Sequence, residues 1–302
     1  MRKTLFVLTG CFALLAHAQQ VAVVTSNVRV PGIDEPGFYP QLSQDGHRLV
    51  YSSGEAQGLK LYDFDSHKVT AISDDNGAGL GAKFGPDGNV YYVTQALGDG
   101  NLVYRTGHCY NVAQGSSQVV LEAQHGAMRA VTGRGGVAIK GSKRSYSSSR
   151  NLGTSVYTEG SKVYITTAGK TVAYSPVESW AGYIWPSLSP DGKKVAFVAA
   201  EKGVVVIDLN GKVLAMLGKY QMPAWYDNDY LVAQNAHDDG HQFTSSQIML
   251  LKADGTCKQA LTASTSMTMQ PCSAAGRIVY TTVDGLLYEM TIAINPQNTA
   301  SR

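Results

Sequence analysis

The sequence places groups that could hold a metal ion in one short run, H-D-D-G-H at positions 237–241. His237, Asp239 and His241 offer two imidazoles and a carboxylate, which suit a divalent cation. A metal site normally draws its ligands from several elements of a fold, and the same run also suits a turn at Asp239-Gly240 capped by an aspartate side chain. Both interpretations stay open, and a divalent cation is the one cofactor that the sequence suggests.

A second group of side chains suits the binding of a ligand rather than a metal. Trp180 and Tyr183 occur in S-W-A-G-Y, where an aromatic ring could contact a sugar or a peptide. The residues that we expect at such a site are Trp180, Tyr183, His125, His241 and Tyr220. Trp180 and His241 are expected to make direct contact. Trp185 directly precedes a proline, and we expect it to pack inside the fold instead.

Motifs that would announce a reaction do not occur in the sequence. G-x-S-x-G, H-E-x-x-H and C-x-x-C are all missing. The glycines of G-A-G-L-G at 77–81 are not followed by an expected helix, so no helix N-terminus is available for a phosphate. A non-enzymatic binding module is therefore the favoured function. The alternative is a metal-dependent lyase or hydrolase that acts on saccharides.

Composition narrows the class of protein. The 302 residues are 44% hydrophobic and only 16% charged, and they include 32 Gly and 17 Tyr, which favours many short strands joined by turns. A net charge of +2 gives no reason to expect nucleic acid as a partner. Of the cysteines, Cys257 and Cys272 could pair, but we expect Cys109, Cys257 and Cys272 to be buried thiols.

The N-terminus has the three parts of a secretory signal peptide over residues 1–18. Arg2 and Lys3 are basic, residues 5–15 are apolar, and A-H-A ends in a cleavage site after Ala18. We expect a periplasmic protein. The alternative is a lipoprotein, because L-T-G-C resembles a lipobox ending at Cys11. No later run reaches the roughly 20 apolar residues that a membrane-spanning helix needs.

These side chains must be positioned by a repeated unit, a strand followed by a P-D-G turn and a second strand. The apolar residues that mark successive units lie 42, 47, 57, 37 and 47 residues apart, and they are Leu42, Phe84, Val131, Leu188, Trp225 and Cys272. This spacing is typical of four-stranded propeller blades, whereas solenoid repeats are shorter. The sequence therefore predicts an all-β, six-bladed β-propeller. The 57-residue interval should hold one blade and an insertion at 140–153.

The last unit supplies only three strands before a polar tail at 296–302. The strand-like run Val21–Val30 precedes the first unit and has no place in it. Pairing this run with the open edge of the last unit would close the ring and remove an exposed edge. We therefore expect a single domain over residues 19–295, closed by its N-terminal strand.

Two segments resemble the repeats of TolB-like propellers, relatives of the WD-type repeat. They are Y-P-Q-L-S-Q-D-G-H-R-L-V-Y at 39–51 and I-W-P-S-L-S-P-D-G-K-K-V-A-F at 184–197, and the end of the repeat is visible as L-K-A-D-G-T-C-K-Q-A-L-T at 251–262. The resemblance covers residues 40–290, although the third and sixth units depart from it. It implies a periplasmic binding module, with an envelope protein, a saccharide or a peptide as partner.

In a propeller the first two strands of each blade are joined on one side of the ring, and the second and third strands on the other. The P-D-G turns share the first side, together with the turns between third and fourth strands. The longer, more varied loops share the second side, where binding residues are usually placed. We expect a monomer that binds its partner on this second side, around the axial opening.

Overall fold

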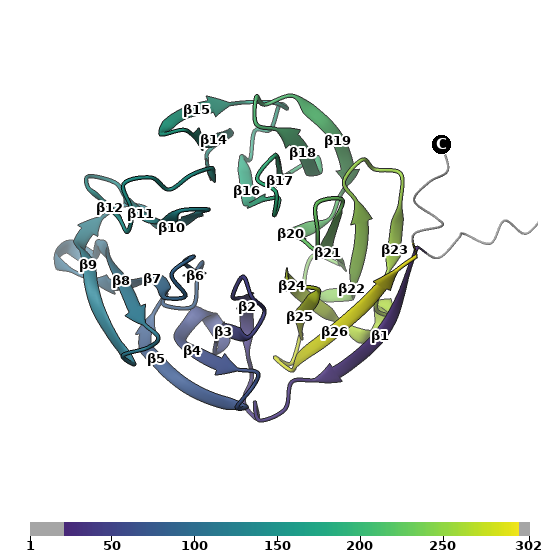
Figure 1. Cartoon of the computed structure of the whole chain (residues 1–302), viewed down its shortest axis with the longest axis horizontal. Coiled ribbons are helices and arrows are strands. Elements are labelled where there is room, and N and C mark those ends of the chain that lie inside the picture. Colours follow the sequence, from purple (N-terminus) through teal and green to yellow (C-terminus); the bar gives the residue numbers. More distant parts are fainter. Residues whose placement is uncertain (1–20, 296–302) are drawn as a thin grey trace, which may run out of the picture.

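The computed structural model describes residues 21–295 and forms six β-sheets arranged around a central axis (Figure 1). The chain is an all-β, six-bladed propeller, as the repeat spacing predicts. Residues 21–295 contain no helix long and apolar enough to cross a membrane. The expected signal peptide, its cleavage site after Ala18, the alternative lipid site Cys11 and the tail at 296–302 lie outside the described residues.

Five blades have four strands, and the third has six. Blade 1 consists of β2 (Phe38–Leu42), β3 (Arg48–Ser52), β4 (Gln57–Asp63) and β5 (Lys68–Asn76). Blade 2 consists of β6 (Lys83–Phe84), β7 (Val90–Leu97), β8 (Val103–Asn111) and β9 (Ser116–His125). Blade 3 consists of β10 (Met128–Gly133), β11 (Gly136–Gly141), β12 (Ser145–Ser147), β13 (Ser155–Glu159), β14 (Lys162–Thr167) and β15 (Lys170–Tyr174).

The other three blades complete the ring. Blade 4 consists of β16 (Tyr183–Leu188), β17 (Lys194–Ala199), β18 (Gly203–Asp208) and β19 (Val213–Gly218). Blade 5 consists of β20 (Gln221–Trp225), β21 (Tyr230–Asp238), β22 (Phe243–Lys252) and β23 (Lys258–Ala260). Blade 6 consists of β24 (Thr268–Ala274), β25 (Arg277–Thr282), β26 (Leu287–Ile294) and β1 (Ala22–Arg29). In each four-stranded blade the first strand of the order given is innermost.

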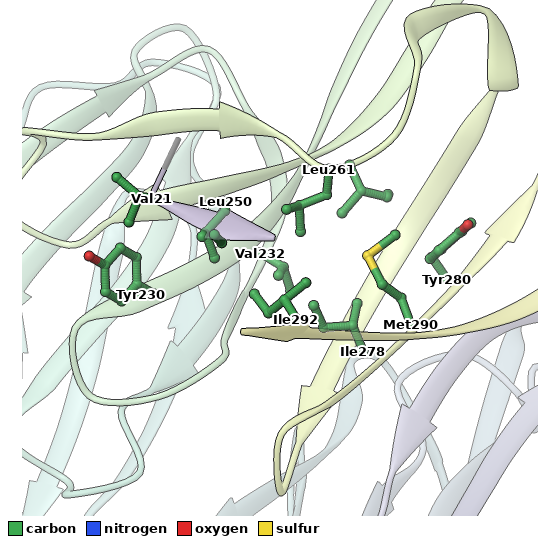
Figure 2. Packing of buried hydrophobic residues seen from close by; sticks show 11 residues of the cluster. Val21, Tyr230, Val232, Leu250, Leu261, Ile278, Tyr280, Met290 and Ile292 are labelled. Carbon is green, nitrogen blue, oxygen red and sulfur yellow. The ribbon is translucent and has the colours of Figure 1, made fainter. Parts of the chain in front are cut away.

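The N-terminal strand closes the ring, as predicted. β1 pairs antiparallel with β26, so the two ends of the described chain share blade 6. Figure 2 shows Val21 packed into the apolar layer between blades 5 and 6, with Tyr230 and Leu250 nearby. The Gln259 side chain of blade 5 accepts hydrogen bonds from the backbone N–H groups of Val21 and Ala22 and donates one to the carbonyl of Ala22. Apolar burial and a polar clamp therefore both hold the strand in place.

Blade 3 corrects the expectation of one blade plus an insertion. Its sheet joins two three-stranded segments, β10–β12 and β13–β15, through the single residue pair Gly133–Ser155. The two segments lie at different positions around the ring (Figure 1). Residues 148–154 therefore connect the two segments beside the turn at Gly135, whose N–H bonds the carbonyl of Leu152. They do not lie with the loops on the other side, where the insertion was expected. The first part of the predicted insertion does lie there, because the Ser142 hydroxyl donates to the carbonyl of His125 at the end of β9.

The P-D-G turns explain how each blade reverses. In blade 4, the Ser189 hydroxyl donates to the carboxylate of Asp191 and accepts from the N–H of Lys194, and Gly192 adopts φ +72°. Serine and aspartate thus replace backbone hydrogen bonds inside the turn, and glycine supplies the left-handed conformation. Cys109, Cys257 and Cys272 are free thiols, and of these Cys257 is only partly buried.

Candidate functional site

A cavity of about 580 Å³ opens at the axis of the ring, on the side that carries the longer loops. Four blades supply its walls. Its lining residues are Phe38, Tyr39, Gly54, Trp185, Gln221, Met222, Gln234, Phe243, Met269, Gln270 and Val283. We call this cavity the axial mouth, its side of the ring the loop face and the opposite side, with the P-D-G turns, the turn face. Cavities of this size are typical of small-molecule or side-chain binding sites.

The four innermost strands around the axial mouth share an unusual backbone feature. Tyr39, Trp185, Met222 and Gln270 have φ values of +52°, +52°, +49° and +55°, and each directly precedes a proline. Left-handed backbone is costly for residues with a side chain. Each of these strands also has an irregularity in its register at this point. In blade 2 the corresponding residue is Gly81, with φ +73°.

Strain of this kind is concentrated in functional sites, where the surrounding structure holds it in place. Here a chain of hydrogen bonds between blades does so. The Gln234 amide of blade 5 accepts from the N–H of Gln270 at 3.1 Å, and the Gln270 amide accepts from the N–H of Tyr39 at 2.7 Å. Gln234 also donates to the buried hydroxyl of Ser246. Two of the four left-handed residues are therefore fixed by side chains from the neighbouring blade.

The axial mouth carries no formal charge, because no Asp, Glu, Lys, Arg or His lines it. Its walls combine aromatic rings and thioethers, which bind apolar groups of varied shape. Within the described residues, the side-chain amide of Gln221 has no hydrogen bond, and the NH₂ group of Gln270 has none either. The mouth therefore offers an apolar surface with a few polar contacts, and it suits a neutral, partly apolar group.

Exposed apolar side chains distinguish the two faces. Among the described residues, those on the loop face are Leu80, Leu97, Leu102, Trp180, Ile184, Trp185, Phe243 and Val283. The remaining exposed large apolar residues lie on outer strands, and they are Val23, Val28, Val119, Leu214 and Met216. The described turns of the turn face contain none. Apolar surface gathered on one face marks an interaction surface.

Trp180 is held out from this face on a rigid turn. Its side chain is 88% exposed. The carboxylate of Glu201 accepts hydrogen bonds from the hydroxyl of Ser179 and from the N–H groups of Trp180 and Ala181. The Ser179 hydrogen bond has the largest effect and, together with those backbone N–H groups, lowers the pKa of Glu201 to about 2, although burial raises it. The ionised carboxylate thus fixes the turn, and the indole is displayed to solvent.

Of the predicted ligand-binding residues, Tyr183 is buried in the core and Tyr220 is half-buried against it. Tyr183 is 3% exposed, packs against Phe197 and donates its hydroxyl to the carbonyl of Val177. Tyr220 packs against the layer between blades 4 and 5, with the ammonium of Lys258 at 5.8 Å from its ring. Burial raises the pKa of both phenols. Their aromatic character predicted contact with a ligand, but Tyr183 on β16 and Tyr220 in the connection between β19 and β20 pack against the apolar layers of the ring.

The histidines do not gather around a metal ion. Residues 21–295 hold no group of three or more His, Cys, Asp or Glu side chains able to share one. Asp239 instead accepts from the N–H groups of His241 and Gln242, with Gly240 at φ +88°, which is the turn interpretation of H-D-D-G-H. His237 and His241 are exposed on this loop. His125 is exposed at the end of β9, with its ring edge-on to Tyr104.

Sequence reasoning missed the residues that form the mouth. Trp185 was expected to pack inside the fold, yet its side chain is 39% exposed and lines the cavity. Tyr39 and Gln270 were not predicted at the site, and Met222 was expected only on the same side of the ring. The signal was present in the repeat, because each of these residues stands directly before the proline of its unit. Residues before proline usually take extended conformations, so the sequence did not predict that these residues would adopt a left-handed backbone near the axis.

No family model matches this chain, and a search of curated proteins finds no match either. The similarities are with solved structures. TolB from Acinetobacter baumannii is 16% identical with a TM-score of 0.54, over 79% of this chain and 57% of that one. This chain thus spans little more than half the length of that protein.

Two other structures match more of their length. A catalytically inactive virginiamycin B lyase from Staphylococcus aureus, solved with quinupristin, is 12% identical with a TM-score of 0.61, over 89% of this chain and 99% of that one. The Cps50 (Swd1) propeller domain of Myceliophteria thermophila is 7% identical with a TM-score of 0.62, over 90% of this chain and 100% of that one. At these identities the similarities show the fold: the chain is a β-propeller whose structural neighbours include TolB and WD40-type proteins.

Proposed function

We propose that this chain is an exported, periplasmic propeller of TolB-like type that acts as a non-enzymatic binding module. Its ligand or protein partner binds on the loop face, with the axial mouth as the central contact. The observation that supports this proposal most directly is the uncharged cavity of about 580 Å³ whose lining includes four left-handed residues, each before a proline. Trp180, on its turn fixed by Glu201, and His241 contact the partner around the mouth.

The alternative, a metal-dependent lyase or hydrolase of saccharides, requires titratable groups that converge on the axis. The similarity to virginiamycin B lyase is a reason to keep an enzyme in view, although at 12% identity it speaks for the fold only. The uncharged lining of the axial mouth favours binding over acid–base chemistry, because none of its residues is a carboxylate or an imidazole.

Photo-crosslinking in the native cell tests the site and the face together. A benzoylphenylalanine replaces Trp185 in one variant and Lys193, exposed in a turn of the turn face, in the matched control. We expect one discrete adduct from position 185, none from position 193, and loss of the adduct when Met222→Lys places a charge in the mouth. Equal adducts from both positions, or an adduct that survives Met222→Lys, would show that the axial mouth is not the site.

A further inference from the structure

Below the axial mouth, an ammonium group reaches across the inner strands of the ring. Lys83 lies on β6, the innermost strand of blade 2, and its Nζ is 3.2 Å from Oε1 of Gln41 on the innermost strand of blade 1. Cys272, on the innermost strand of blade 6, is close enough for its charge state to affect Lys83. Side chains from two blades thus meet at this cation, and a third blade places Cys272 nearby. Lys83 lies deep within the ring but stays partly accessible.

The surroundings of this cation are neutral. Burial raises the pKa of the Cys272 thiol to about 12, so it carries no negative charge at neutral pH. Among the described residues, Lys83 forms no ion pair with a carboxylate. Burial also lowers the pKa of Lys83, because loss of water is not offset by a counter-charge. A buried ammonium without an acidic partner is costly unless an anion comes to it.

The chain places this cation directly beneath the mouth. Gln41 follows the mouth residue Tyr39 by two positions, and Cys272 follows Gln270 by two positions. A strand rises about 3.3 Å per residue, and these strands are irregular at this point, so the level of Lys83 lies at most about 7 Å further along the axis than the mouth. In a C-terminal aromatic residue, the ring and the carboxylate lie a similar distance apart. An apolar group in the mouth and an anion at Lys83 could therefore belong to the same end of one ligand.

We propose that the axial mouth and Lys83 together bind the C-terminus of a peptide chain that ends in an apolar or aromatic residue. The last side chain contacts Trp185 and Met222, and the terminal carboxylate accepts hydrogen bonds from the Lys83 ammonium. The free amide groups of Gln221 and Gln270 bind carbonyls of the peptide backbone, a contact that a simple apolar acid lacks. This inference rests on the proposed function and specifies the ligand of the same site.

Calorimetric titration with matched ligands tests the carboxylate. The probes are N-acetyl-Ala-Ala-Phe as the free acid, the same peptide as its C-terminal amide, and 3-phenylpropionate. The wild-type protein should bind the free acid at least 10-fold more tightly than the amide, because only the acid pairs with Lys83. The acid should also bind more tightly than 3-phenylpropionate. If 3-phenylpropionate binds as tightly, the ligand is a simple apolar acid and the peptide assignment is overturned.

Variants of Lys83 complete the test. Lys83→Met should remove the preference for the acid and leave the affinity for the amide unchanged, whereas Lys83→Arg should keep the preference. Lys83→Met should also fold, because it replaces an ammonium that has no carboxylate partner among the described residues with an apolar side chain of similar length. Lys193→Met, on the turn face, is the matched control and should behave as wild type.

Outcomes for this inference and for the proposed function can be told apart. Equal binding of acid and amide, or a preference that survives in Lys83→Met, would overturn the role of the carboxylate. If both peptides also lose affinity in Trp185→Ala, the mouth is still the binding site and the proposed function stands. If neither peptide binds, the peptide-terminus inference is wrong, and the crosslink from position 185 decides the proposed function independently.

Discussion

Polar side chains have different roles on the two faces of this ring. On the turn face they are tied into the backbone, within and between blades. Arg134 of blade 3 donates to the carbonyls of Pro190 and Asp191 in blade 4, and the N–H of Asp191 donates to the Asn228 side chain in blade 5. Every one of these bonds fixes a turn against its neighbour. Loss of one of these hydrogen bonds should therefore cost stability.

On the loop face, hydrogen bonds fix the positions of side chains but leave some of their polar groups free to bind another molecule. The amides of Gln234 and Gln270 fix backbone N–H groups, yet the NH₂ group of Gln270 has no hydrogen bond within the described residues. Glu201 fixes the turn that displays Trp180. The hydrogen bonds of this face therefore keep side chains in position for contact with another molecule. The two faces together suggest that one stabilises the ring while the other binds.

The largest expected effect comes from opening the ring, which both faces need. Deletion of residues 19–30 removes β1, exposes the edge of β26 and uncovers the apolar layer that Figure 2 shows. The loss should be comparable to the whole free energy of unfolding, about 5–15 kcal/mol for a domain. Thermal melting and light scattering should show non-cooperative unfolding and association. A truncated protein that stays monomeric and melts at the wild-type temperature would contradict this closure.

The sequence predicted the ring because the same turn motif recurs in most of the blades. P-D-G and its variants mark blades 1, 2, 4 and 5, and the unplaced run Val21–Val30 predicted the closing strand. The double nature of blade 3 escaped notice, because its second segment reverses through E-G-S-K and T-A-G-K at 159–162 and 167–170. Those turns lack the aspartate of the repeat. The turn motif therefore identifies a blade, but it does not give the number of strands in a blade whose turns lack the motif.

The candidate site was predicted less well than the fold. The loop face was identified from loop length, and Trp180 and His241 are exposed on it. The side chains of the mouth depend on a left-handed backbone at Tyr39, Trp185 and Met222, which tertiary contacts impose against local preference. The environment of the Lys83 ammonium is formed only where residues of three blades come together at the axis. No single stretch of sequence contains that information.

On the turn face, the expected effect of a substitution is on stability alone. Ser189→Ala removes a buried hydroxyl that donates to Asp191 and accepts from the N–H of Lys194. Such a loss should cost about 1–3 kcal/mol of unfolding free energy. Urea unfolding measures it, and Asp191→Ala should behave similarly. Binding by the folded variant should equal wild type, and a folded Asp191→Ala protein that fails to bind would reverse the roles of the two faces.

On the loop face, the expected effect is on affinity alone. Trp185→Ala removes a central aromatic contact and should weaken binding of the acid peptide by about 1–3 kcal/mol, in the range of a binding hot spot. Trp180→Ala and His241→Ala, further from the axis, should each weaken binding of a protein partner by no more than that. Melting temperatures should stay close to wild type. Equal losses of stability in these variants would erase the distinction between the faces.

Low pH should destabilise the protein mainly through the carboxylates in the turns of the turn face. The hydroxyl of Ser43 and the N–H of His47 lower the pKa of Asp45. Burial raises the pKa of Asp191, but hydrogen bonds from Ser189 and Lys193 outweigh it and lower the value overall. Carboxylates with a depressed pKa in the folded state stabilise above their unfolded value of about 3.9, and this contribution is lost as the pH falls through the folded value.

Unfolding free energy should therefore decline below about pH 4. The double variant Asp45→Asn, Asp191→Asn should show a shallower decline than wild type, although Glu201 adds to the decline from the loop face. Urea titrations at several pH values between 3 and 6 measure the slope. An unchanged slope in the double variant would show that these turns do not carry the acid sensitivity.

The smallest expected effect isolates the strain at the mouth. Trp185 has φ +52°, and a side chain in this conformation costs about 1 kcal/mol relative to glycine. The Trp185→Gly variant should therefore be more stable than Trp185→Ala by up to about 1 kcal/mol. At an ordinary strand position the order is the opposite, because glycine destabilises a strand relative to alanine. Both variants should bind equally poorly, because both lack the indole.

Leu214, exposed on β19 and without a positive φ, is the matched position for this comparison. There the order should invert, with Leu214→Gly less stable than Leu214→Ala by about 0.5–1 kcal/mol. If glycine is the less stable residue at both positions, the left-handed residues carry no strain, and the axial mouth loses one of its arguments for a binding site. If the order inverts only at position 185, the ring gives up stability at the mouth in order to present this side chain.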